Sequence, residues 1–177
     1  MKPILVEDSR QQILPVDKHA KKHAWWRSHG VDVMRYKLDF GDYAAFGSNI
    51  ACDTKANIQE MCGNLGKDHA RVVREIERAR DAGFRLVFLV ETGGNYESVD
   101  DIARWTNDVC KRCGEYRAYL CHPPRERCKK FKRRPMTGAT LAKIMHGMEA
   151  DHGCVFDFAH PLMAAKRVCD ILGVRYH

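Results

Sequence analysis

Apolar residues follow one another without interruption at residues 86–90, and such a run is typical of a central strand that is buried on both faces. Shorter strand patterns occupy residues 4–6, 31–38, 43–46, 49–52 and 155–158. Gly47, Ser48 and Asn49 separate two of these patterns, and turn-forming residues at that place predict a hairpin over residues 41–55.

Helical periodicity fills most of the intervals between these strands. A short helix with one buried face is predicted by the i, i+3, i+4, i+7 spacing of Ile58, Met61, Cys62 and Leu65. Further helices are predicted at residues 17–28, 68–82, 99–105, 137–149 and 161–172. In the first of them, the inner side is expected to hold Ala20, Ala24 and Trp25. Strands that alternate with helices predict an α/β fold.

The chain has 177 residues, which predicts one domain that buries roughly two-thirds of the surface of its unfolded chain. No apolar run approaches the ~20 residues that span a bilayer. Residues 1–7 become acidic too early for a signal peptide, so a cytoplasmic protein without a membrane segment is expected. A disulfide framework is not expected there, and the eight cysteines are left with metal binding or burial as their roles.

Basic residues exceed acidic ones, with 30 Lys and Arg against 23 Asp and Glu and a net charge of +7. An anionic partner such as nucleic acid suits this balance, although net charge by itself bears only on solubility and steering.

Candidate chemistry lies in the predicted hairpin, at Gly41-Asp42-Tyr43 and Asp53-Thr54-Lys55. Two carboxylates on neighbouring strands can hold a divalent cation against a phosphate, and a lysine beside them can position water or stabilise the developing anion. This combination is typical of metal-dependent phosphodiester hydrolysis. The alternative is a pair of surface aspartates beside ordinary turns.

The helix predicted at residues 68–82 carries arginines along one side, because Arg71, Arg74 and Arg78 are spaced to share a face. One interpretation is a solvated face with intrahelical ion pairs. The other is contact with a nucleic-acid backbone, which requires that this face border the Asp42/Asp53 site.

Residues 108–134 form a segment that is rich in cysteines and basic residues. Its cysteines are Cys110, Cys113, Cys121 and Cys128. The first two have the Cys-x-x-Cys spacing with which two thiolates reach one tetrahedral zinc ion, and a zinc site would order a segment with little apolar content. Scattered free thiols are the alternative.

The second half of this segment is densely basic, with Arg125, Arg127, Lys129, Lys130, Lys132, Arg133 and Arg134. Three interpretations remain for this stretch: a solvated tail, a surface for protein contact, or an element that binds the DNA backbone with a steep dependence on salt.

Several of these motifs together resemble the XPF-type nuclease domain. Asp8-Ser9-Arg10 is similar to the D-x-R-E opening of that domain, and Gly41-Asp42-Tyr43 to its G-D-Y/F element. Asp53-Thr54-Lys55 stands where the family has E-R-K. Residues 63–71 resemble its S-L-x-x-x-R-F region, and residues 86–91 its apolar strand ending in glutamate. With residues 135–141, the chain looks like the small XPF-like proteins encoded by bacterial phages and prophages.

The resemblance implies a restriction-endonuclease-like fold, a mixed central sheet flanked by helices, with residues 108–134 as an insertion. It implies that Asp42 and Asp53 are ligands of Mg²⁺ or Mn²⁺ and that Lys55 is the catalytic lysine. Asp8 would be a further acid, and Arg10 would hold a phosphate or orient the acids. The implied activity is endonucleolytic cleavage of branched, flapped or junction DNA in replication, repair or recombination, in a bacterial or phage-infected cell. A homodimer is a further expectation from the family.

Three positions depart from the family pattern. Asp53 is one methylene shorter than the family's glutamate, Gln59 stands where E-R-K-x-x-x-D ends in aspartate, and Gln11 stands where D-x-R-E has glutamate. These departures keep open a second hypothesis, a DNA-binding protein with the nuclease fold and weak or no catalysis.

Overall fold

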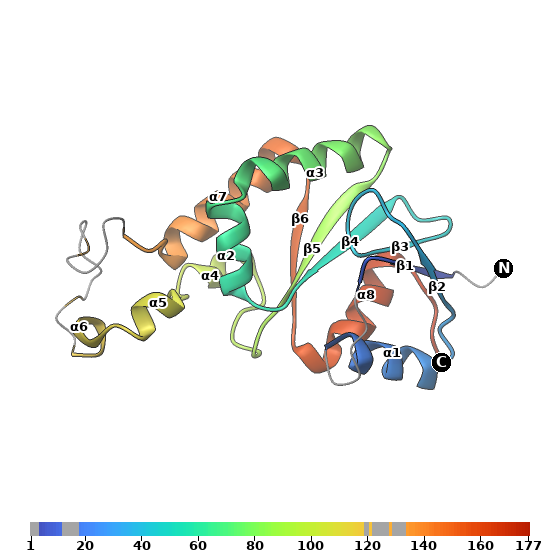
Figure 1. Cartoon of the computed structure of the whole chain (residues 1–177), viewed down its shortest axis with the longest axis horizontal. Helices are drawn as coiled ribbons and strands as arrows, with labels where there is room; N and C mark the ends of the chain where they lie inside the picture. The colour runs from blue at the N-terminus through green and yellow to red at the C-terminus, as the bar shows by residue number, and fades with distance from the viewer. Residues whose placement is uncertain (1–3, 12–17, 119–120, 122–127, 129–133) are drawn as a thin grey trace.

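A six-stranded sheet in the order β2-β1-β3-β4-β5-β6 lies at the centre of the computed structural model (Figure 1), which describes residues 4–11, 18–118, 121, 128 and 134–177. Its strands are β1 (Leu5–Asp8), β2 (Val33–Tyr36), β3 (Tyr43–Ala45), β4 (Ile50–Lys55), β5 (Arg85–Glu91) and β6 (Val155–Ala159). The predicted hairpin is confirmed as β3 and β4, and the apolar run at residues 86–90 lies in β5, between β4 and β6.

Strand direction places several chain segments at one edge of the sheet. β1 pairs with β2, β4 with β5 and β5 with β6 in parallel, whereas β3 is antiparallel to both β1 and β4. The sheet is therefore mixed. The carboxyl ends of β1, β4 and β5 lie at the same edge as the amino end of β3, and such an edge is where α/β folds place their sites.

Helices cover both faces of the sheet (Figure 1), as expected for an α/β fold. One face carries α2 (Ile58–Gly66), α3 (His69–Asp81), α4 (Val99–Ile102) and α7 (Gly138–His152). The other carries α1 (Lys18–Ser28) and α8 (Ala164–Leu172), with the short turn η1 (Pro161–Met163) before α8. Two short helices, α5 (Asp108–Lys111) and α6 (Gly114–Arg117), extend away from the sheet beyond α4.

Each face of the sheet has its own hydrophobic core, and β5 contributes to both. Phe88 is fully buried against α3 and α7 residues such as Ile76 and Met145, whereas the next residue, Leu89, is buried with Trp26 of α1 on the opposite face. Side chains of a strand alternate between faces, so a strand that is apolar throughout can fill two cores.

The inner face of α1 differs from the prediction. Ala24 is exposed and Trp25 is half-buried, whereas His19, Lys22 and Trp26 are buried. The prediction was wrong because it followed the apolar residues of this helix, and two of the positions that face the sheet are polar. His19 Nδ1 lies 3.4 Å from the Tyr43 hydroxyl of β3, and the partner of Lys22 is an acid of the sheet, as described below.

Candidate active site

Four residues predicted to be catalytic lie where β1 and β4 end. Asp8 is the last residue of β1, Asp42 directly precedes β3, and Asp53 and Lys55 lie in the second half of β4. The Asp8 amide donates to the Asp42 carbonyl oxygen at 2.8 Å, and the Asp42 amide donates to the Cys52 carbonyl oxygen at 2.8 Å. Backbone pairing across three strands thus brings these segments together.

A tight turn and two hydrogen bonds from β4 orient the Asp42 side chain. Gly41 has φ 67°, and a β-carbon there would lie 3.1 Å from the Cys52 carbonyl oxygen, so the turn favours glycine. The amide and the hydroxyl of Thr54 both donate to Asp42 Oδ2, at 2.8 and 2.7 Å. No role was predicted for Thr54 from the sequence. Its position between Asp53 and Lys55 was the one feature of the sequence that could have indicated a role at the site.

Asp53 and Lys55 form a buried ion pair on the same face of β4. The Lys55 ammonium donates to both carboxylate oxygens of Asp53, at 2.7 and 2.9 Å, and both residues are buried. Burial first, and the negative charge of Asp42 second, raise the pKa of Asp53 to about 7, although Lys55 acts in the opposite sense. The site therefore sets two negative carboxylates, the buried Asp53 and the half-buried Asp42, against one ammonium, which favours binding of a further cation.

A third acid, Glu75 of α3, also reaches this site. Its Oε1 accepts from the Gly41 amide at 3.2 Å, and its negative charge contributes to the raised pKa of Asp53. Arg71 lies 3.4 Å from Glu75 Oε2. Glu75 was not predicted to belong to the site, because the spacing along a helix does not show that α3 packs beside the hairpin.

Asp8 and Arg10 form a pair at the margin of the site. Arg10 Nε donates to Asp8 Oδ2 at 2.8 Å, and Arg10 Nη2 donates to the Leu38 carbonyl oxygen at 2.6 Å. Burial alone would raise the pKa of Asp8, but hydrogen bonds from Arg10 and from the Leu38 amide lower it overall. The Asp8 carboxylate is thus kept ionised beside a guanidinium that remains largely exposed.

The two glutamines that depart from the family pattern both have hydrogen-bond partners. Gln11 Nε2 donates to Asp42 Oδ1, a bond that a glutamate could not make while ionised. Gln59 Oε1 accepts from the Asp108 amide at 2.9 Å, and Asp108 is the first residue of α5. Gln59 therefore fastens the start of the Cys-rich segment to α2.

The Gln59 contact gives a prediction about local stability. Gln59→Ala removes the acceptor for a backbone amide at the amino end of α5, so exchange of the Asp108 amide is expected to accelerate about five-fold, the equivalent of ~1 kcal/mol. Gln59→Glu keeps an acceptor oxygen and serves as the matched control. Hydrogen exchange followed by mass spectrometry checks this, and equal exchange in Gln59→Ala and in the parent would contradict it.

The opposite face of the sheet carries a separate buried ionic cluster. Lys22 Nζ of α1 lies 2.8 Å from Glu91 Oε1 at the end of β5. His23 lies 3.0 Å from Glu7 Oε1, and Arg35 lies 3.3 Å from Glu7 Oε2. Phe88 pairs with Asp53 in the sheet, and Glu91, three residues later, points to the other face. The glutamate that ends this strand, noted in the sequence, therefore belongs to this cluster and not to the Asp53 side.

The arginines predicted to bind DNA on α3 are exposed, and Arg71 contacts Glu75 beside the site. Arg74 and Arg78 follow on the same side of the helix. The basic face thus borders the Asp42/Asp53 site, the condition set for its role in binding. In the Cys-rich segment, Arg134 is exposed, whereas Lys129, Lys130, Lys132 and Arg133 lie outside the described residues.

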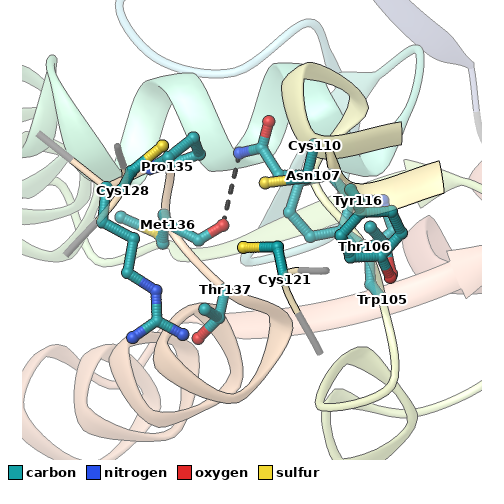
Figure 2. Close-up of a pocket in the computed structure, with 11 residues that line it drawn as sticks. Trp105, Thr106, Asn107, Cys110, Tyr116, Cys121, Cys128, Pro135, Met136 and Thr137 are labelled. Carbon is teal, nitrogen blue, oxygen red and sulfur yellow. Dashed lines mark hydrogen bonds between the residues drawn. The ribbon is translucent and has the colours of Figure 1, made fainter. Parts of the chain in front are cut away.

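Three of the four cysteines predicted to bind zinc line one pocket (Figure 2). The pocket has a volume of about 70 Å³, and its walls include Cys110, Cys121 and Cys128 together with Trp105 and Met136. All four cysteines of the segment are free and half-buried.

Within the described residues, no helix is long and apolar enough to cross a membrane. The same residues contain no group of three or more His, Cys, Asp or Glu side chains already arranged around a metal position. Comparison of the chain with protein-family models and with curated proteins gave no match.

Proposed function

We propose that this protein is a divalent-metal-dependent endonuclease that hydrolyses phosphodiester bonds in branched DNA. The observation that carries the proposal is the buried pair of Asp53 and Lys55 beside the half-buried Asp42, at the edge of a mixed sheet. Two crowded carboxylates and one ammonium at a sheet edge are the groups that this chemistry requires. The restriction-endonuclease-like arrangement of the sheet is part of the same proposal.

The residues present suit Mg²⁺ or Mn²⁺. Asp42 and Asp53 would hold the cation, because a buried carboxylate whose pKa is raised to about 7 beside another carboxylate gains from a neighbouring positive charge. Mg²⁺ commonly binds through one or two carboxylates and keeps several waters, so a full cage of protein ligands is not needed. Bound there, the cation would lower the pKa of a water molecule at the scissile phosphate and offset the charge that develops on it.

The other residues of the site have distinct roles in this proposal. Lys55 Nζ, now 2.7 Å from Asp53 Oδ1, would turn one of its protons toward the attacking water or the phosphate oxygen. Arg10, whose guanidinium is largely exposed, would bind a phosphate next to the scissile one. Thr54 and Gln11 would hold the Asp42 carboxylate in place through their hydrogen bonds.

Contact with the DNA backbone is assigned to the arginine face of α3. Arg71, Arg74 and Arg78 are exposed, and the face begins beside Glu75 at the site. Backbone contacts of this kind carry no sequence information, which suits an enzyme that selects DNA by shape. The net charge of +7 favours the approach of DNA in the same way.

The proposal is tested by incubating the pure protein with flap, fork and four-way-junction DNA in Mg²⁺, in Mn²⁺ and in a chelator. Strand cleavage that requires the divalent cation and prefers at least one branched form over linear duplex is expected. No cleavage of any substrate with either cation would overturn the proposal.

A second candidate function is junction binding without catalysis. Gln11 and Gln59 favour it, because both stand where the XPF-type nuclease domain has acids. The side-chain amide of Gln11 contacts Asp42, and that of Gln59 contacts the Asp108 amide. Tight binding of branched DNA without cleavage, in the same panel of substrates and cations, would select this function over the first.

Thr54 offers a conservative test of how Asp42 is positioned. Thr54→Val removes the hydroxyl that donates to Asp42 Oδ2 at 2.7 Å but keeps the size of the side chain and the amide bond. A hydrogen bond to a charged group contributes about 1.5–3 kcal/mol, so the Mg²⁺ concentration for half-maximal cleavage is expected to rise at least ~10-fold. Thr54→Ser should behave like the parent, and an unchanged Mg²⁺ requirement in Thr54→Val would contradict this role.

A further inference from the structure

The cysteines of the segment at residues 108–134 differ from the others in where they lie. Cys52, Cys62, Cys154 and Cys169 are buried, each in one of the two hydrophobic cores, where a thiol acts as a small apolar side chain. Cys110, Cys113, Cys121 and Cys128 are half-buried and belong to neither core. Packing therefore gives no reason for four thiols in this segment.

Three of these four cysteines line one pocket, and the fourth, Cys113, lies one turn from Cys110. The Cys113 amide donates to the Cys110 carbonyl oxygen at 2.9 Å, so a single tight turn joins the two residues of the Cys-x-x-Cys pair. Cys121 and Cys128 line the same pocket as Cys110 (Figure 2), although 10 and 17 residues, respectively, lie between them and Cys110 in the sequence.

The segment that carries the four thiols is closed at its base. Asn107 Nδ2 donates to the Met136 carbonyl oxygen at 3.3 Å, which joins the two ends of the segment (dashed line in Figure 2). The Asn107 side chain also caps α5, since its Oδ1 accepts from the Val109 amide at 3.0 Å. Gln59 of α2 holds the Asp108 amide beside it. Both ends of the segment are therefore held in place, and a metal ion bound by its cysteines would fix the part between them.

We propose that Cys110, Cys113, Cys121 and Cys128 bind one structural Zn²⁺ ion. Four thiolates from two pairs of cysteines are a common ligand set for tetrahedral structural zinc, with Zn–S distances of about 2.3 Å. Four neutral thiols release four protons when they become thiolates around the ion, so that the site carries a net charge of −2. The sulfur atoms are not yet placed around one point, and binding draws them together within the pocket.

Zinc at this position links the Cys-rich segment to the candidate active site. The segment begins at Asp108, whose amide is held by Gln59, and α2 follows directly after Lys55 at the end of β4. Basic residues occupy positions 125–134 of the same segment, and Cys128 stands among them in the sequence. The ion would thus hold Cys128 against a segment that is attached to α2. The zinc inference itself does not depend on nuclease activity.

Zinc analysis of the full chain, purified without a metal-binding tag from zinc-supplemented medium, tests the inference. About one zinc ion per chain is expected in the parent, and less than about a tenth of that in Cys110→Ser and in Cys121→Ser. Cys154→Ala, which removes a thiol in the hydrophobic core, is the matched control and should retain the parent content. Circular dichroism shows whether each variant is folded.

Titration of the zinc-free parent with Co²⁺ provides a second readout that needs no variant. Four thiolates around Co²⁺ give an intense visible absorption typical of a tetrahedral site, and the ion should quench the fluorescence of Trp105, which lines the pocket. Added Zn²⁺ should remove the absorption. A parent that contains no zinc and gives no such absorption, a disulfide between any two of the four cysteines in the freshly purified protein, or full zinc content in Cys110→Ser and Cys121→Ser would each overturn the inference.

Discussion

Asp53→Asn is expected to unfold at a higher temperature than the parent at pH 8 in the absence of divalent cations. The parent buries Asp53 beside the half-buried Asp42, and both carboxylates act on the single ammonium of Lys55, so Asp53→Asn leaves one carboxylate for that ammonium. The lost contact between Lys55 and Asp53 offsets part of the gain, so a net increase of about 1–3 kcal/mol in the free energy of unfolding is expected. Thermal unfolding followed by circular dichroism measures it.

The difference between Asp53→Asn and the parent should depend on pH with a definite sign. Because folding raises the pKa of Asp53 from 3.8 to about 7, the folded chain binds this proton more tightly than the unfolded chain does. The stability that results is fully present below pH 3.8 and is lost as the pH rises through 7. The increase in stability of Asp53→Asn over the parent should therefore be largest above pH 7 and small near pH 4.

Mg²⁺ or Mn²⁺ should raise the unfolding temperature of the parent and have little effect on Asp53→Asn, because the cation binds the folded site. Asp81→Asn, which changes an exposed acid at the end of α3, is the control and should match the parent throughout. Lower stability of Asp53→Asn at pH 8, or an equal response of both proteins to the cation, would contradict this description of the site.

Lys55→Met is expected to have the opposite effect on stability and to lose cleavage as well. The substitution leaves the buried Asp53 carboxylate, with the half-buried Asp42 beside it, without the ammonium that lies 2.7 Å from Asp53 Oδ1. Removal of one partner of a buried pair is strongly destabilising, and at pH 8 we expect a loss of about 2–4 kcal/mol. Protonation of Asp53 relieves the repulsion, so the loss should be smaller at pH 5. Denaturant unfolding at the two pH values measures it.

Two further results separate charge from packing in Lys55→Met. Mn²⁺ should restore part of its stability, since the cation replaces the missing positive charge, but cleavage should stay low because the proton donor is gone. Lys55→Arg keeps the charge in a larger side chain and should be more stable than Lys55→Met at pH 8. If Lys55→Met were as stable as the parent at both pH values, the ammonium would not be balancing the two carboxylates.

Most elements of the fold could be predicted from the sequence because their periodicity is local. The run at residues 86–90 became β5, and the apolar spacing from Ile58 to Leu65 became the buried face of α2. The face of α1 could not be predicted in this way. Its buried positions include His19 and Lys22, and a polar residue is buried only when a distant chain segment supplies a partner, here Glu91 for Lys22.

The residues of the candidate site also differ in whether the sequence alone could identify them. Asp42, Asp53 and Lys55 could be identified because a hairpin brings together residues that are close in the sequence. Glu75 could not, since it reaches the site only through the packing of α3 beside the hairpin. The roles of Gln11 and Gln59 could not be predicted from the sequence either. Each looked like a missing acid, whereas one holds Asp42 and the other holds the Cys-rich segment.

The most direct test of the proposed active site compares cleavage of one branched DNA by the parent and by Asp53→Asn. Enzyme in excess over labelled flap DNA, with Mg²⁺ added to start the reaction, gives the rate of the chemical step. Mg²⁺-dependent cleavage by the parent is expected, with a rate at least ~100-fold lower for Asp53→Asn, a variant expected to be more stable than the parent. Equal cleavage by the two proteins would contradict the assignment of Asp53 and with it the proposed metal site.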